Sequence, residues 1–365
     1  MRLILYLLFI LTPMQIMAKS TLATTDIVDE QHLLKLLDEY IDRRELYTEQ
    51  KEEKIKQLKI KLRIAHNNDK RLSILDAIYR EYYTYNYDSA MVYVNRGLSL
   101  ALSDNNTYYV TLNRINRAAV LSTGGFYSQA ETLLNEIGEK NVPQQLKQYY
   151  YYTTTWLYNY WESFCDKSEF KNYYRQKKLQ FLRLTVNTTH SNYVGLYAYL
   201  SGELAYLENP LGKDVLRHYT IAINNSPVNS RVHASAAYCI ARYNRELGNM
   251  QLYEKYIVEA AISDIVCPLK ENLALQELST YLYKKNSKYA NYAARYIYIS
   301  MEDAQFYNNR LRMLEISNIL PIIANANQEA LAHKERIVRG VLAVVSFLSL
   351  VLFAMAIFGY KQNKW

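Results

Sequence analysis

Residues 118–137, AAVLSTGGFYSQAETLLNEI, form the stretch that decides the fold of this chain. Apolar residues recur at helical spacing on both sides of Gly125, where a turn is favoured. The small and apolar positions that carry this pattern are Ala118, Ala119, Leu121, Gly125, Ala130, Leu134 and Ile137. Pro143 follows the second apolar segment and cannot continue a helix. The stretch therefore predicts two helices joined by a short turn.

Similar helix pairs recur on both sides of this stretch. The pattern matches the tetratricopeptide repeat, a helix pair of about 34 residues with small residues near positions 8, 20 and 27. The residues equivalent to position 20 are Ala90, Ala130, a position near Tyr173, Val215, Tyr253 and Ala293. Because a single pair cannot bury its apolar face, the pairs must stack. We predict an all-α protein, with a tetratricopeptide-like solenoid of six pairs across residues 67–300. An irregular helical bundle is the alternative.

Composition supports helices. Ten glycines and six prolines in 365 residues are too few for a β-sandwich or a dinucleotide-binding fold, which need many turns. Half of the residues are hydrophobic, so a sizeable core is available. The net charge of +8 would suit nucleic acid, but residues 1–18 argue against that partner. They combine Arg2, an apolar run and Ala18 in the layout of a secretory signal peptide, with an uncleaved anchor as the alternative.

The segments around the repeats complete the predicted organisation. Residues 19–66 predict an N-terminal helical pair, and residues 301–336 predict a capping helix and stalk that Pro321 should kink or stop. Residues 337–360 predict a transmembrane helix, because 340–359 are twenty consecutive residues without a charge. Residues 361–365 are then a short cytoplasmic tail. The predicted location is the inner membrane, crossed once, with the body in the periplasm. Whether the stalk runs as one helix into the membrane stays open.

No motif of known chemistry is found in the sequence. Phosphate-binding loops, zinc-protease and serine-hydrolase motifs and paired cysteines are absent, and no histidine stands at ligand spacing from another histidine or a cysteine. We therefore predict no enzyme activity, no catalytic residue, no metal and no cofactor. The best candidate for a ligand groove is an aromatic segment, in which core packing is the competing interpretation. Its residues are Tyr149, Tyr150, Tyr152, Trp156, Tyr160 and Trp161.

Several short segments resemble a known family. Two of them supply the residues Tyr85, Asn86, Tyr87, Asp88, Asp303, Phe306, Tyr307 and Asn308, and a third contains Pro321. They are similar to an uncharacterised family of exported, membrane-anchored bacterial tetratricopeptide-like proteins described as transcriptional regulators. The resemblance implies a periplasmic helical-repeat sensor, one membrane span, and then a cytoplasmic coiled coil and a helix-turn-helix domain. This sequence departs from it after Tyr360, where only five residues remain. The cytoplasmic DNA-binding part is expected to be missing.

These observations predict a membrane-anchored periplasmic protein that acts as the sensory, ligand-binding input part of a transmembrane signalling or transcription-regulatory protein. The alternative is an envelope scaffold that mediates protein–protein interactions without signalling, and an envelope hydrolase is a third interpretation. The expected partners are a periplasmic protein or peptide and the lipid bilayer, with a homodimer allowed. Direct contact with nucleic acid is not expected from the residues present.

Overall fold

The computed structural model of this chain describes residues 29–271 and 273–362. The predicted signal peptide, residues 1–18, and the last three residues of the predicted tail lie outside this range. Every regular element in the described part is a helix. The helices are α1 (Glu30–Asp42), α2 (Arg44–Ile64), α3 (Asn68–Tyr82), α4 (Tyr87–Ser103), α5 (Thr107–Thr123), α6 (Tyr127–Ile137), α7 (Lys147–Phe164), α8 (Lys171–Thr188), α9 (Val194–Glu208), α10 (Lys213–Asn224), α11 (Arg231–Glu246), α12 (Met250–Val266), α13 (Ala274–Lys285), α14 (Ala290–Tyr307) and α15 (Arg310–Gln362).

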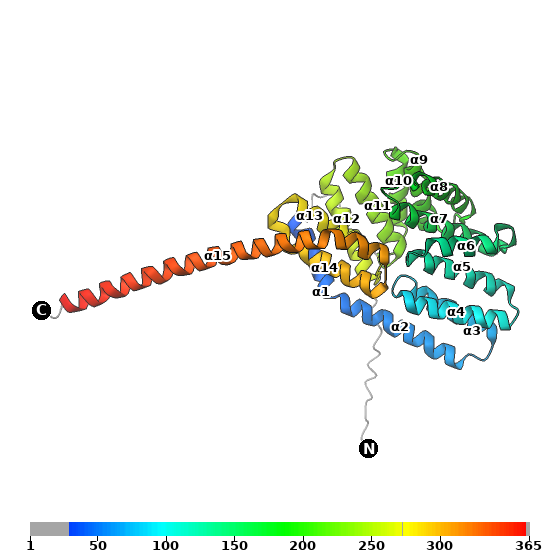
Figure 1. Cartoon of the computed structure of the whole chain (residues 1–365), viewed down its shortest axis with the longest axis horizontal. Helices are drawn as coiled ribbons and strands as arrows, with labels where there is room; N and C mark the ends of the chain where they lie inside the picture. Colours follow the sequence, from blue (N-terminus) through cyan, green and yellow to red (C-terminus); the bar gives the residue numbers. More distant parts are fainter. Residues whose placement is uncertain (1–28, 272, 363–365) are drawn as a thin grey trace, which may run out of the picture.

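From α3 to α14 the described helices form six packed pairs that follow one another in a solenoid (Figure 1). The predicted fold class is therefore confirmed. Local signals set the ends of several helices. The side chains of Asn67, Asn86 and Asn106 accept hydrogen bonds from main-chain N–H groups in the first turns of α3, α4 and α5. Gly125 and Gly248 have φ angles of 85° and 76° in two of the turns, a conformation that glycine adopts without strain.

The predicted position-20 residues lie where helices of one pair approach each other. Five of the six side chains are fully buried, those of Ala90, Ala130, Val215, Tyr253 and Ala293. The sixth position was predicted near Tyr173, but that side chain is 53% exposed. Its neighbour Tyr174 turns inward instead and stacks on Trp161, with ring centroids 4.3 Å apart. Tyr174 therefore occupies this position, directly after the residue near which the sequence pattern placed it.

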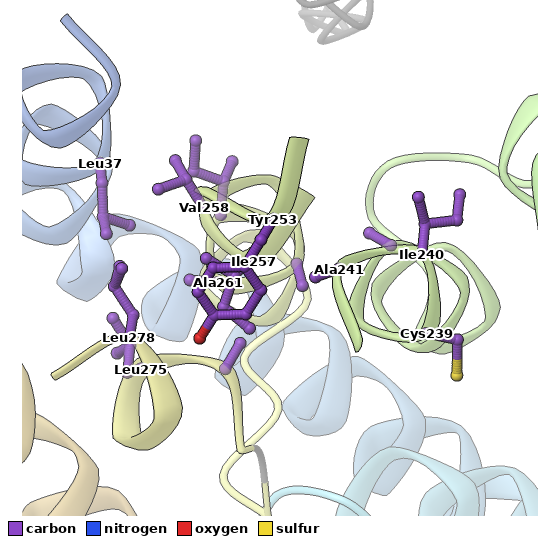
Figure 2. Close-up of a cluster of buried hydrophobic side chains, with 14 of the residues drawn as sticks. Leu37, Cys239, Ile240, Ala241, Tyr253, Ile257, Val258, Ala261, Leu275 and Leu278 are labelled. Carbon is purple, nitrogen blue, oxygen red and sulfur yellow. The ribbon is translucent and has the colours of Figure 1, made fainter. Parts of the chain in front are cut away.

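The two N-terminal helices do not fold back on each other. Only Arg43 separates α1 from α2, and a helical hairpin needs a loop of about two to five residues. α1 instead packs against α12, far along the chain, and lies beside α14 in Figure 1. Figure 2 shows Leu37 of α1 next to Leu275 and Leu278 of α13 and near Val258 of α12. The N-terminal segment therefore covers the C-terminal repeats and closes the superhelix.

Polar contacts flank this apolar contact between α1 and the last repeats. Arg295 of α14 pairs with Asp38 at 2.9 Å and with Asp42 at 2.5 Å. The Lys285 ammonium group lies 2.9 Å from Glu30. These side chains are partly or largely exposed, so each pair adds at most about 1 kcal/mol. Burial of the leucines therefore supplies most of the free energy of the contact between α1 and the last repeats. The ion pairs fix the position of α1 along α14.

α15 is one continuous helix that begins in the body and extends away from it (Figure 1). Pro321 was expected to kink or stop this helix, and the helix does not stop there. The proline leaves the carbonyl of Ser317 without its main-chain donor, but Ser317 and Pro321 are both exposed, so water can reach that carbonyl. Ile316 and Ile323, on either side, are buried against the body and hold the helix in place. The helix thus continues from the body through the predicted membrane segment.

Candidate binding site

The first aromatic face of α7 consists of Tyr149, Tyr152, Trp156 and Tyr160. The Tyr149 hydroxyl lies 3.1 Å from that of Tyr79 on α3, two repeats earlier. The Trp156 ring stacks on Tyr199 of α9, with centroids 6.3 Å apart. In an open solenoid each repeat contacts only its neighbours. Contacts between the first and third pairs therefore mean that the superhelix curls until this face of α7 lies near its centre.

The second aromatic face of α7 is part of the core. The Tyr150 hydroxyl donates to the carbonyl of Leu134 on α6 at 3.2 Å, and that side chain is buried. Trp161 lies between Tyr127 on α6 and Tyr174 on α8, with centroids 5.8 and 4.3 Å away. These two predicted groove residues fill space between adjacent helices.

An arginine on α11 lies in contact with the first aromatic face. Arg231 pairs with Glu271 at 2.5 Å and donates to the Tyr160 hydroxyl at 3.3 Å. Its guanidinium carbon lies 5.4 Å from the ring centroid of Tyr83, within cation–π range. The Tyr160 hydroxyl donates to Glu271 at 3.0 Å. We call Tyr83, Tyr149, Tyr160, Arg231 and Glu271 the central cluster. It joins the α3–α4 turn, α7, α11 and the α12–α13 segment.

The central cluster combines charge with partial exposure. The side chain of Arg231 remains 28% exposed, whereas Glu271 is only 6% exposed. Burial raises the pKa of Tyr160, and the Glu271 carboxylate beside it raises that pKa further. Asp264, close by on α12, also has a raised pKa, first because it is buried and then because Glu271 and Asp303 are nearby. The cluster therefore contains one arginine–carboxylate ion pair, of which the arginine is the more exposed partner, and several neutral hydroxyl groups.

The segments that carried the family resemblance meet in space beside this cluster. Tyr85 and Phe306 have ring centroids 5.1 Å apart, and the Asn86 amide donates to the carbonyl of Phe306 at 3.3 Å. Tyr307 is fully buried, contacts Tyr87 edge to face, and donates to the main-chain oxygen of Tyr83 at 2.8 Å. The turn before α4 and the end of α14 therefore form one interface.

The remaining residues of these segments have separate positions. Asp303 pairs with Lys270 at 2.5 Å. Asn308 ends α14 in the left-handed conformation with φ 70°, which asparagine tolerates better than most residues. Asp88 is exposed in the first turn of α4, where its charge favours the helix N-terminus. Pro321 lies well along α15 and has no part in this interface.

Sequence reasoning identified the aromatic part of this site and missed its charged part. Tyr149 and Tyr160 stood out because their spacing repeats along one helix. Arg231 begins a helix and Glu271 lies between helices, so neither belonged to a periodic pattern. Among the described residues no group of three or more His, Cys, Asp or Glu side chains could hold a metal ion.

Comparison with known proteins gives one family match. Residues 41–318 match the family described as the SusR N-terminal TPR domain. No curated protein matches the chain. The matched range runs from the end of α1 into the first part of α15, so it contains all six helix pairs and the central cluster. α15 is also long and apolar enough to cross a membrane, and its most apolar 18-residue window has no buried residue.

Proposed function

Because this chain belongs to the family described as the SusR N-terminal TPR domain, we propose that it is the sensory input part of a membrane-anchored signalling or transcription-regulatory protein. Its helical repeats bind a peptide, a glycan or a protein in the periplasm, and α15 carries the response to the membrane. The signal peptide at residues 1–18 and the uncharged stretch at 340–359 support export and a single C-terminal span.

The partly exposed Arg231 is the observation that carries this proposal. A guanidinium group with five donors is well suited to carboxylate and hydroxyl acceptors, and its geometry favours planar, paired hydrogen bonds. Glu271 and Tyr160 occupy part of this donor capacity, and 28% of the side chain stays accessible. The half-buried rings of Tyr83 and Tyr149 lie beside it, and a ligand that replaces the Arg231 guanidinium on the Tyr83 ring would contact apolar surface there. Repeat domains of this kind bind partners through such curved surfaces.

The contacts of Tyr307 link the central cluster to α15. Arg231 lies over the Tyr83 ring, and the main-chain oxygen of Tyr83 accepts the Tyr307 hydroxyl. Asn308 follows directly, and the side chain of Asn309 accepts the main-chain N–H of Arg312 to begin α15. A ligand that displaces Tyr83 or Arg231 therefore acts on the residues that set the direction of α15.

The proposal is tested by comparing transcript profiles of cells carrying the wild-type gene, a deletion, Arg231→Lys or Arg217→Ala. Arg231→Lys keeps a cation beside the buried Glu271 carboxylate but removes the paired hydrogen bonds of the guanidinium group. Arg217 is an exposed arginine on α10 whose partner Asp214 is also exposed, so its loss should have no effect. We expect Arg231→Lys to change the same transcripts as the deletion while its level in the membrane fraction stays normal. If the deletion leaves every transcript unchanged and crosslinking recovers stable envelope partners, the protein is a scaffold instead.

A further inference from the structure

A groove between α2, α3 and α4 is lined by Arg71 and Leu75 in the first half of α3, whereas the central cluster lies beside Tyr83 at the other end of that helix. The volume of the groove is about 340 Å³. Leu62, Leu75 and Leu100 line its apolar part, and Arg71 and Arg96 line its charged part. We propose that this groove binds the carboxyl-terminal end of an extended peptide whose last side chain is apolar. This second site does not depend on the proposed sensing role.

The apolar part of the groove comes from three helices. Leu62 near the end of α2 and Leu75 on α3 are buried, and Leu100 of α4 is half-buried. An apolar side chain placed against them loses contact with water without separating any of the helices. A volume near 340 Å³ is at the small end of ligand sites, which span roughly 300–1,000 Å³. It suits the end of a peptide better than a folded surface.

The charged part of the groove is strongly basic. Arg71 and Arg96 are both exposed, and neither has an ion-pair partner among the residues that the structure describes. The Arg96 guanidinium carbon lies 5.1 Å from the Tyr93 ring centroid, which limits its freedom. Two guanidinium groups beside an apolar floor match a terminal carboxylate, which each can bind through paired hydrogen bonds.

The surroundings add to this positive charge. From Lys54 to Ile64, α2 carries five basic residues and no acidic one. The only acidic residue of α4 is Asp88, in its first turn at the far end from the groove. Lys54 and Lys56 pair with Glu81 and Glu53, whereas Lys59, Lys61 and Arg63 have no ion-pair partner among the described residues. Two nearby carboxylates, Asp69 and Asp104, accept amide donors from Asn106 at 3.1 Å and Asn68 at 2.7 Å; they keep their negative charges and offset part of the positive charge. An anionic partner is therefore attracted to this end of the protein.

Two features favour a peptide over a fatty acid, which shares the carboxylate and the apolar chain. The exposed side chains of Asn95 and Ser99 also line the groove, and they can hydrogen bond to the main-chain groups of a peptide. A fatty acid has no group to use them. In addition, α15 leaves the body on the side away from α3 and α4 (Figure 1). The groove therefore lies far from the segment proposed to enter the bilayer.

The test uses the full chain in detergent micelles and a fluorescein-labelled tetrapeptide, Gly-Ser-Ala-Leu, with either a free carboxyl end or an amidated end. Fluorescence anisotropy should show saturable binding of the free acid, at least about tenfold tighter than the amide. Arg71→Ala with Arg96→Ala should weaken it by about tenfold or more. Ser99→Glu, an exposed change that adds a negative charge, should weaken it as well.

Arg217→Ala is the matched control, and circular dichroism checks that each variant stays folded. Arg231→Lys, which keeps the cation beside Glu271, should bind the tetrapeptide normally, and this separates the groove from the central cluster. The proposal is overturned if the amide binds as tightly as the acid, or if no saturation occurs up to about 1 mM peptide. It is also overturned if decanoate competes with the peptide at equal concentration, because the site would then be a lipid site.

Discussion

Loss of Arg242 is expected to destabilise the body strongly, because it would leave a carboxylate buried without its cation. Glu203 on α9 is only 5% exposed. Arg242 on α11 donates to its Oε1 atom at 3.0 Å, the Tyr219 hydroxyl donates at 2.6 Å and the Cys239 thiol donates at 3.2 Å. These four side chains connect α9, α10 and α11 within the main core.

The shifted pKa of Glu203 indicates how much stability its contacts contribute. Burial alone would raise this pKa, but Arg242, Lys178 and the two hydrogen bonds lower it to about 2, from an ordinary value of 4.5. A difference of about 2.5 pKa units corresponds to roughly 3 kcal/mol of stability. Because the pKa is lower in the folded state, this stability is present above pH 4.5 and is lost as the pH falls toward 2. In Arg242→Ala we expect a loss of about 3–5 kcal/mol at neutral pH.

The assay is guanidinium unfolding of the detergent-solubilised full chain, followed by circular dichroism at several pH values. Three variants are compared, Arg242→Ala, Glu203→Gln and the two changes together. Since the penalty comes from an unpaired charge, the double variant should be more stable than Arg242→Ala alone. Arg217→Ala, which removes an exposed ion pair, should cost less than about 1 kcal/mol. The reasoning fails if Arg242→Ala costs no more than this control, or if the costs of the two single changes simply add.

Three further changes test the packing of the superhelix. Leu37→Ala should cost about 2–5 kcal/mol and make α1 the first site of limited proteolysis, because this buried side chain attaches α1 to the last repeats. Tyr307→Phe should cost about 1–3 kcal/mol and speed amide hydrogen exchange at the α14–α15 junction, because the main-chain oxygen of Tyr83 loses its donor and the buried Thr123 hydroxyl loses a hydrogen-bond partner. Unchanged exchange there would contradict the role given to Tyr307. Gly202→Ala should lower the thermal midpoint at a cost of about 1–3 kcal/mol, because the added carbon would lie 2.6 Å from the Tyr219 ring.

The sequence contained enough local information to predict the helix pairs. Residues such as Ala90, Ala130 and Ala293 report contacts between helices that are adjacent in the chain, and these contacts produce a periodic pattern. The sequence placed the sixth such position only near Tyr173, because the adjacent Tyr173 and Tyr174 have the same chemical character and the pattern does not distinguish them. Pro321 was expected to kink or stop its helix because a local preference takes no account of the buried isoleucines that hold α15 on both sides.

The candidate site was predicted only in part, because its geometry depends on how the repeats add up. Each helix pair is rotated slightly relative to the one before it, and the total rotation over several pairs determines whether α3 lies near α7 and α11. No single segment of the sequence contains this information. Tyr149 and Tyr160 were visible as a face of one helix. Arg231 and Glu271 acquire their roles only when the superhelix closes.

Closure of the superhelix also places the start of α15 in contact with the first repeats. The end of α14 packs on the turn before α4, and Arg310 at the start of α15 lies over the Phe126 ring of the α5–α6 turn, 4.2 Å from its centroid. α15 thus begins where the two ends of the solenoid meet. An open solenoid could change curvature without moving its last helix relative to the first repeats. In this closed form, we expect a partner that separates α14 from the turn before α4 to shift the start of α15 relative to the first repeats, where Arg310 lies over the Phe126 ring.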